Sequence, residues 1–315
     1  MNPVLAEVVR SGFTESVHRG SVVVLAADGT PRLELGNTRE PVFPRSASKP
    51  LQALGMLRAG LSVPDDDLAL VSASHSGEPE HRRRVLDLLR THGFTEDDLR
   101  CPADLPLHEA SREAVLRDGG GRGRATMNCS GKHAGMLATC AKAGWNPASY
   151  PDPEHPLQRA IAATVEELAG ESIAATGVDG CGAPLFGYSL TGLARAFTRL
   201  SGSAVADAMR AHPWLVGGTG REDTVLMSEV PGLLAKGGAE GVHAMALPDG
   251  TACALKIDDG ASRAREPVLI GLLHALGVPL GGTAEALAER PVLGGGGPVG
   301  AIRLSPTARE HFRSS

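Results

Sequence analysis

The sequence has few aromatic residues: Phe, Trp and Tyr together make up 3% of its 315 residues. Its core is therefore expected to consist mainly of Leu, Val, Ala and Ile. Hydrophobic residues reach 42% and charged residues 21%, proportions that are typical of a soluble globular protein. The length suits one large or two small domains, and no internal repeat or long linker interrupts it.

Long basic tracts are also absent, and the formal net charge is −5. Binding to nucleic acid or to an acidic membrane surface requires clustered Lys and Arg, so we expect neither partner. No stretch has the ~18 uncharged apolar residues of a membrane-spanning helix. The first thirteen residues contain Glu7 and Arg10 and do not have the pattern of a signal peptide. We therefore expect a cytoplasmic protein.

The sequence also has no cysteine pattern typical of a disulfide framework, since its five cysteines are odd in number and widely spread. In a cytoplasmic protein they are expected to be thiols and not disulfides. They are Cys101, Cys129, Cys140, Cys181 and Cys253.

The order of the predicted elements indicates the fold class. Hairpins are expected over 20–35, with a turn at Asp28-Gly29, and over 241–257, and a last strand over 300–304. Helical patterns occupy 80–92, 109–117, 133–144, 157–169, 190–200, 204–211 and 267–276. Strands at both ends and helices in the middle do not alternate as βαβ units do. We predict an α+β protein whose antiparallel sheet combines both ends of the chain, a single domain of residues 1–315 with a helical insertion of roughly 78–230.

One short stretch combines a serine and a lysine at helical spacing. Ser46 lies three residues before Lys49, at the start of an apolar segment, and positions i and i+3 share a helix face. A neutral lysine can take the proton of a serine and make it a nucleophile. The alternative is a helix start at which the serine caps and the lysine faces water. Pro50 belongs in the first helical turn, because it has no N–H to donate.

Six short motifs together point to a family. They cover residues 45–50 (Arg-Ser-Ala-Ser-Lys-Pro), 72–78 (Ser-Ala-Ser-His-Ser-Gly-Glu), 129–137, 179–181, 220–221 and 236–239. In this order and at similar spacing, they resemble the asparaginase II family, the rhizobial or class 3 type of L-asparaginase. The resemblance implies a fold related to serine β-lactamases and glutaminases.

The resemblance also implies catalysis by two serine–lysine pairs, Ser46 with Lys49 and Ser74 with Lys236. A lysine base needs its pKa lowered from ~10.4 to near ~7–8, and burial or a second ammonium group has that effect. Ser46 is expected to be the nucleophile and Ser74 to transfer protons. From the residues alone, Ser74 would be a loop hydroxyl and Lys236 a solvated turn lysine.

The resemblance also implies a metal site. Cys129, Lys132 and Cys181 match the zinc ligands of the family, with Asp179 close by, two residues before Cys181. Thiolates suit zinc, whereas lysine is an unusual ligand because only its neutral form has a lone pair. From spacing alone, Cys129 would be structural and His133 a capping or core residue.

Substrate contacts and assembly follow from the same resemblance. A guanidinium group at Arg221 could clamp an α-carboxylate by two hydrogen bonds, although a loop salt bridge is the alternative. The implied partner chain is a second copy, in a homodimer. The predicted substrate-binding residues are Arg45, His133, Asp179, Arg221 and Ala239.

The predicted reaction is hydrolysis of L-asparagine to L-aspartate and ammonia. Two alternatives remain open at this point: a serine amidohydrolase of the same fold that acts on glutamine or a lactam, and a non-catalytic amino-acid sensor. The presence of both serines and both lysines favours an enzyme.

Overall fold

A computed structural model describes residues 1–313 and divides the chain into two compact units. Unit 1 comprises Met1–Ala47, Tyr188–Ser201 and the chain from Val225 onward, and unit 2 comprises Ser48–Gly187 and Gly202–Thr224. Most of the predicted helical insertion of 78–230 lies in unit 2, which also includes residues 48–77.

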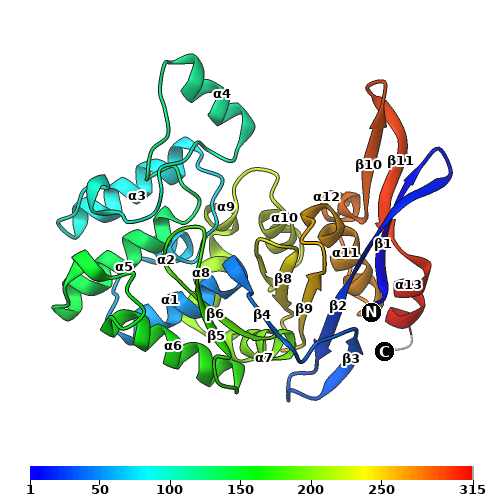
Figure 1. The fold of residues 1–315 in the computed structure, drawn as a ribbon, viewed down its shortest axis with the longest axis horizontal. Coiled ribbons are helices and arrows are strands. Elements are labelled where there is room, and N and C mark those ends of the chain that lie inside the picture. The colour runs from blue at the N-terminus through cyan, green and yellow to red at the C-terminus, as the bar shows by residue number, and fades with distance from the viewer. Residues whose placement is uncertain (314–315) are drawn as a thin grey trace. The chain divides into compact units, whose positions relative to one another are not determined.

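Unit 1 is built on a sheet of eight strands, and every pair of neighbours is antiparallel (Figure 1). Strands from both ends of the chain lie next to one another in this sheet, so the predicted α+β class is confirmed. The order is β10 (Glu289–Gly294), β11 (Gly297–Leu304), β1 (Val4–Arg10), β2 (Phe13–Leu25), β9 (Ala252–Ile257), β8 (Val242–Ala246) and β7 (Leu234–Gly237), and β3 (Pro31–Leu35) pairs with β2.

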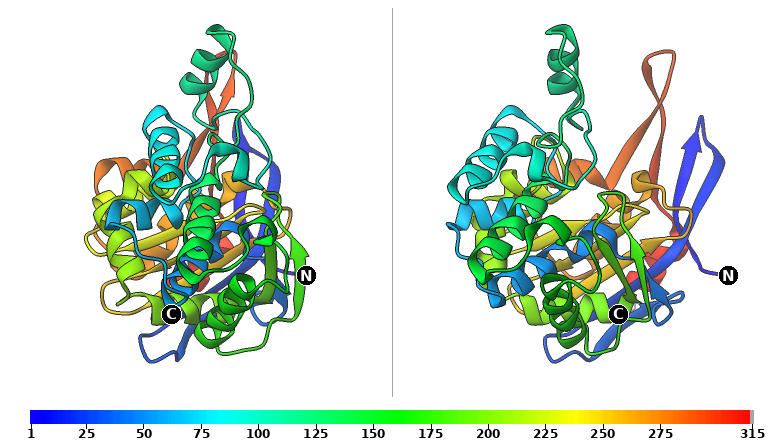
Figure 2. Two further views of the ribbon diagram at one scale, coloured as in Figure 1. Left: turned by 90° about the vertical axis from the view of Figure 1, so that its left-hand side faces the viewer. Right: turned by 60° about the vertical axis from the view of Figure 1, so that its left-hand side comes forward.

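The two predicted hairpins are present. In the first, Val22 of β2 pairs with Leu35 of β3, and in the second, Ala244 of β8 pairs with Ala254 of β9. Strands β1 and β10 were not predicted, because neither has a clear alternating pattern. The hairpins β1–β2 and β10–β11 project side by side from the sheet (Figure 2), with β1 paired to β11.

Helices cover this sheet within unit 1. Every residue of β2 from Gly20 to Leu25 is buried, so this part of the strand has no solvent-facing side. Helix α7 (Leu190–Leu200) packs on β2, β8 and β9, and α11 (Arg265–Ala275) packs on β1 and β11. Next to α11 lie α12 (Gly282–Glu285), η4 (Ser262–Ala264), η5 (Ala286–Ala288) and α13 (Pro306–Arg313).

Unit 2 is mainly helical and is arranged around α5 (Ser130–Ala143). Every residue of α5 from Ser130 to Cys140 is buried, which is the pattern of a helix at the centre of a core. Contacts with α5 come from α1 (Lys49–Arg58), α2 (Asp65–Val71), α3 (Pro79–Thr91) and α6 (Pro156–Ala169). The other helices are α4 (Glu109–Arg117), α8 (Ala204–Ala211), α9 (Pro213–Val216), α10 (Glu222–Glu229, which continues into unit 1), η2 (Glu96–Asp98) and η3 (Pro147–Ser149).

A small sheet runs β4 (Pro41–Val42), β6 (Pro184–Ser189), β5 (Ala175–Val178), and β6 crosses from unit 2 into unit 1. The turn between β5 and β6 carries Asp179 and Cys181. This short sheet therefore fixes the position of two of the predicted site residues.

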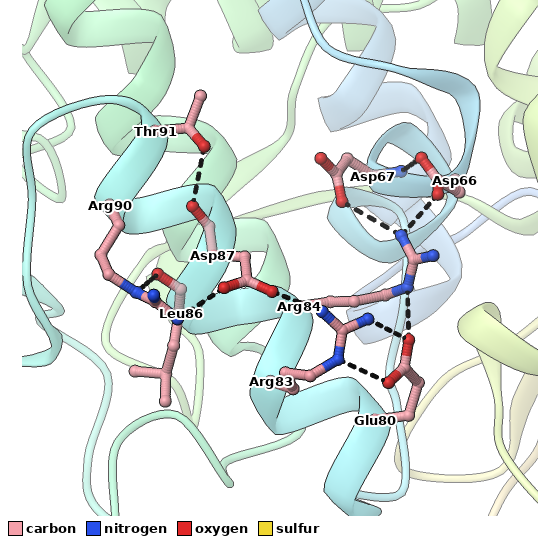
Figure 3. Close-up of polar contacts among 9 residues, drawn as sticks. All are labelled: Asp66, Asp67, Glu80, Arg83, Arg84, Leu86, Asp87, Arg90 and Thr91. Carbon is pink, nitrogen blue, oxygen red and sulfur yellow. Dashed lines mark hydrogen bonds and ion pairs between the residues drawn. The ribbon is translucent and has the colours of Figure 1, made fainter.

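The arginine run on α3 forms ion pairs at the surface (Figure 3). Arg83 contacts Glu80 and Asp87 at 2.6 Å each, and Arg84 contacts Asp66 at 2.5 Å and Glu80 at 2.9 Å. Hydrogen bonds from Arg83, and then from Arg84, lower the pKa of Glu80 to about 2. The run thus stabilises the surface of its own helix.

Within residues 1–313, no helix has both the length and the apolar character needed to cross a membrane.

Candidate active site and metal centre

The Ser46 segment forms a helical turn. Arg45–Ser48 is a 3₁₀-helix that leads directly into α1, where Lys49 is the first residue and Pro50 lies in the first turn. Ser46 is half-buried. Arg45 has a φ of 53°, which is rare for a residue other than glycine. Such local strain occurs preferentially at functional sites.

The four predicted catalytic residues are divided between the units. Ser46 and Lys236 belong to unit 1, and Lys49 and Ser74 belong to unit 2. Of the predicted substrate-binding residues, Arg45 and Ala239 belong to unit 1, and the other three belong to unit 2.

In unit 1, the end of β7 lies against the Ser46 turn. A Cβ atom added to Gly238 would lie 2.5 Å from Pro44 O, 3.1 Å from Ala47 N and 3.4 Å from Ser46 N. Only a glycine permits this approach. The backbone N–H groups of the Ser46 turn therefore lie beside the residue that precedes Ala239.

Side chains within unit 1 hold this turn of the chain in place. Arg265 donates hydrogen bonds to Gly238 O and, at 3.3 Å, to Val242 O. Lys236 is fully buried, and its Nζ donates to Gly237 O at 2.8 Å. Ala239 is exposed, and its N–H donates to no acceptor within residues 1–313. This N–H is available to a ligand.

In unit 2, Lys49 and Ser74 are in direct contact. Lys49 is 1% exposed, and its Nζ lies 2.9 Å from Ser74 Oγ and 2.6 Å from Ala73 O. The family resemblance paired Ser74 with Lys236, whereas the lysine that contacts Ser74 within unit 2 is Lys49. No spacing rule relates residues 49 and 74, so only the packing of α1 on the loop after α2 reveals this pair.

The loop that carries Ser74 is held by its backbone. Ser74 N donates to Val216 O at 3.1 Å, and Arg221 Nη1 donates to Ser74 O at 3.3 Å. Glu78 accepts hydrogen bonds at 2.8 Å from both the N–H and the hydroxyl of Thr219. These contacts bring the predicted residue Arg221 next to Ser74.

His75 packs directly behind Ser74. Its Nε2 lies 2.9 Å from Ser130 Oγ, and its ring stacks on His81 at a centroid distance of 5.0 Å. Burial, followed by the charges of His81 and Lys49, lowers the pKa of His75 well below its ordinary value. His75 is therefore a neutral packing residue at neutral pH and was not predicted as part of the site.

The predicted zinc ligands come together in unit 2. Cys129 precedes α5, Lys132 lies in its first turn, and Cys181 follows β5. Ligand atoms of Cys129, Asp179 and Cys181 all lie within 4.8 Å of one another, and Lys132 Nζ lies 3.3 Å from Cys181 Sγ. All five cysteines are buried and free.

The two cysteines differ in their acidity. A hydrogen bond from Cys129, and then the ammonium group of Lys132, lower the pKa of Cys181 far below its ordinary value. The pKa of Cys129 is raised, because it donates that hydrogen bond and is buried. Burial alone would lower the pKa of Lys132, but Cys181, Cys129 and Asp179 together raise it. These shifts favour the thiolate form of Cys181 beside the ammonium group of Lys132.

The residues present fit a zinc ion. Two thiolates bound at ~2.3 Å with tetrahedral geometry lie ~3.8 Å apart, and the 4.8 Å cluster of Cys129, Asp179 and Cys181 accommodates this separation. Lys132 fits as a ligand only after it loses its proton, since metal ligands bind deprotonated.

His133 lies beside this cluster and is fully buried. Its Nδ1 is 2.6 Å from Tyr150 Oη, and burial lowers its pKa. The sequence predicted a substrate contact here, and Tyr150 was not predicted at all, because a tyrosine seventeen residues away in the chain gives no local signal.

Comparison with known proteins gives one family. The family model described as L-asparaginase II matches residues 6–304 of the chain. The search of curated proteins found no match to the chain. Among solved structures, the chain is similar to a β-lactamase from Mycobacterium bovis, with 14% identity, a TM-score of 0.38 and coverage of 81% of this chain and 94% of that one.

Proposed function

Since the chain belongs to the L-asparaginase II family, whose model spans nearly all of it, we propose that it hydrolyses L-asparagine to L-aspartate and ammonia. The family supports an amidohydrolase of the L-asparaginase type. The observation that carries the proposal furthest is that the buried Lys49 amine lies 2.9 Å from Ser74 Oγ, because this contact places the proposed base of Ser46 beside the proposed proton-relay serine.

In this proposal, Ser46 attacks the side-chain amide carbon of asparagine, and Lys49 takes the hydroxyl proton. The tetrahedral oxyanion accepts hydrogen bonds from the N–H groups of Ser46 and Ala239. The C–N bond then breaks and the nitrogen leaves as ammonia, with its proton supplied through Ser74 and Lys236. Water then attacks the acyl group on Ser46 and gives a proton through Ser74 to Lys236, while Lys49 returns its proton to the Ser46 oxygen as the C–O bond breaks and aspartate leaves.

Substrate binding is assigned to charged groups around this centre. The guanidinium of Arg221, held against Ser74 O, binds the α-carboxylate in a two-point manner. Arg45 and the N–H of Ala239 are also proposed to contact the substrate, and Asp179 to pair with the α-ammonium group. His133 is fully buried and is kept as a proposed substrate contact.

Zinc is proposed as the cofactor, held by Cys129, Lys132 and Cys181 with Asp179 close by. When bound, it supplies a positive charge that holds and polarises a polar group of the substrate, while the serine–lysine pairs carry out the chemical step. We also propose a cytoplasmic homodimer, as the family suggests.

An assay with three substrates tests the reaction. We expect ammonia release from L-asparagine, with less from L-glutamine and no opening of a chromogenic lactam. Faster release from glutamine would mark the chain as a glutaminase, and lactam opening would mark it as a lactamase. Absence of any turnover, combined with tight binding of asparagine, would make the chain an amino-acid sensor.

The zinc site gives a separate prediction. The purified protein should contain about one zinc per chain, and its removal by a chelator should raise KM roughly tenfold or more, a loss of ~1.4 kcal/mol in binding, with a smaller change in kcat. Cys129→Ala should have the same effect, and Cys140→Ala, which replaces a buried cysteine in the helix that Cys129 precedes, should not. Metal analysis and steady-state kinetics measure both quantities. A metal-free enzyme with unchanged KM and kcat would show that the cysteines are merely structural.

A further inference from the structure

Two segments of unit 2 lie side by side and are joined by hydrogen bonds. They are the Ser74 loop, residues 74–78, and the Arg221 segment, residues 213–221, which contains α9 and the turn after it. Ser76 Oγ donates to Gly217 O at 2.9 Å. A Cβ atom added to Gly218 would lie 2.8 Å from Ser76 Cβ, so the two segments approach more closely than any other residue at this position would allow.

Glu78 makes the last contact of the Ser74 loop with the Arg221 segment. It is 8% exposed, and its two carboxyl oxygens accept hydrogen bonds at 2.8 Å from the N–H and from the hydroxyl of Thr219. Trp214 Nε1 lies 3.1 Å from the same hydroxyl. Because an indole N–H can only donate, the Thr219 oxygen accepts from Trp214, and its own hydrogen points to Glu78.

Arg221 lies at the end of the segment that Glu78 holds. Its backbone N–H donates to Gly218 O at 3.4 Å, and its Nη1 donates to Ser74 O at 3.3 Å. Its Nε lies 3.7 Å from Glu222 Oε2, and its Nη2 donates to no acceptor within residues 1–313. The backbone and one guanidinium nitrogen are therefore fixed by the protein, and the other nitrogen is available to a ligand.

We propose that Glu78 is a positioning residue for the substrate: through Thr219 it holds the guanidinium of Arg221 in the orientation that binds the α-carboxylate. The inference rests on the role proposed above for Arg221. Two-point binding of a carboxylate requires a guanidinium that is oriented as well as charged. Glu78 itself does not contact the substrate in this proposal, because both of its oxygens are engaged by Thr219.

Variants of Thr219 test the link with little change in size. We expect KM for L-asparagine to rise ~10-fold or more in Thr219→Val and in Glu78→Gln, with a smaller change in kcat, because the carboxylate is bound both before and during the reaction. Thr219→Ser keeps the hydroxyl and should retain the wild-type KM. The control is Thr164→Val, which removes a buried hydroxyl that donates to Ala160 O within α6 and should leave KM unchanged.

Two further readouts distinguish positioning from a general loss of structure. The first substrate comparison uses β-alaninamide, which is asparagine without its α-carboxylate. The ratio of kcat/KM for asparagine to kcat/KM for β-alaninamide should fall ~10-fold in Thr219→Val, because only asparagine uses Arg221. In a second comparison, adding Glu78→Gln to Arg221→Lys should change KM by less than ~2-fold, because the two residues act as one unit.

Calorimetric binding of L-aspartate gives a test that needs no turnover. Its affinity should fall ~10-fold or more in Thr219→Val and in Glu78→Gln and remain at the wild-type value in Thr219→Ser. If Glu78→Gln does not fold, the two variants of Thr219 decide the question alone. A chain that releases no ammonia from any amide but shows this pattern of aspartate affinities would overturn the proposed hydrolysis and leave the positioning role in place.

Other results would count against the role of Glu78. An unchanged KM in Thr219→Val and in Glu78→Gln would remove it. An equal loss with asparagine and β-alaninamide would make the contact merely structural. A full effect of Glu78→Gln in the Arg221→Lys background would mean that Glu78 acts independently of Arg221. A wild-type chain that binds no aspartate would overturn the roles of both residues, and the ammonia assay alone would then judge the proposed hydrolysis.

Discussion

Replacing Ser46 with alanine should abolish hydrolysis of asparagine and leave no acyl adduct on the protein. Ser46 is the more exposed of the two candidate serines, since it is half-buried, whereas Ser74 is 4% exposed. It also stands at the N-terminal end of α1, where a developing negative charge is favoured, and beside the strand end that carries the free N–H of Ala239. A lost nucleophile removes the covalent intermediate and with it nearly all activity.

Ser74→Ala should behave differently. If Ser74 relays protons, its loss should slow turnover by ~10²–10⁴-fold, and the adduct on Ser46 should still form. The contact between Lys49 and Ser74 makes this comparison necessary, because a lysine amine at 2.9 Å could activate Ser74 directly.

Mass spectrometry of enzyme quenched during turnover distinguishes the two serines. We expect the mass of the acyl group on the peptide that contains Ser46, in the wild type and in Ser74→Ala. Ser72→Ala is the control, since Ser72 is a buried serine of the same segment whose hydroxyl donates to Leu68 O. An adduct on Ser74, or one that persists in Ser46→Ala, would exchange the roles.

The sequence predicted those parts of the fold that have a local signal. The hairpins β2–β3 and β8–β9 have alternating or β-branched residues around an Asp-Gly turn, and their pairing was predicted correctly. Strand β1 combines apolar residues with Glu7 and Arg10, so neither period stands out. Its pairing with β11 joins segments from opposite ends of the chain, and sequence patterns do not contain that information.

The candidate site was predictable only as a set of residues. The motifs named Lys49 and Ser74, but their contact joins two segments 25 residues apart and follows from packing. The same holds for Tyr150 against His133 and for Arg265 against Gly238. In each case the polar group is buried and therefore needs a hydrogen-bond partner. Which residue is that partner depends on the three-dimensional packing.

Gly238→Ala should lower kcat by ~10²-fold or more while the protein remains folded. The new Cβ would lie 2.5 Å from Pro44 O and 3.1 Å from Ala47 N. Both are backbone atoms, so no side chain can rotate away, and the strand end must separate from the Ser46 turn. Overpacking of this kind costs ~1–3 kcal/mol of stability, which a chain of this size can tolerate.

The effect on catalysis should be larger than the effect on stability, because the separation moves the N–H of Ala239 away from the N–H of Ser46. Loss of a single oxyanion-hole donor lowers kcat by ~10²–10³-fold, and KM should change less, since the oxyanion exists only after attack. Gly282→Ala is the control: it lies in the same unit, and its added Cβ would contact nothing within 4 Å. Kinetics and thermal unfolding of both variants measure the two effects separately. A Gly238→Ala enzyme with wild-type kcat would mean that the two N–H groups need not stay together, and the proposed oxyanion hole would have to be abandoned.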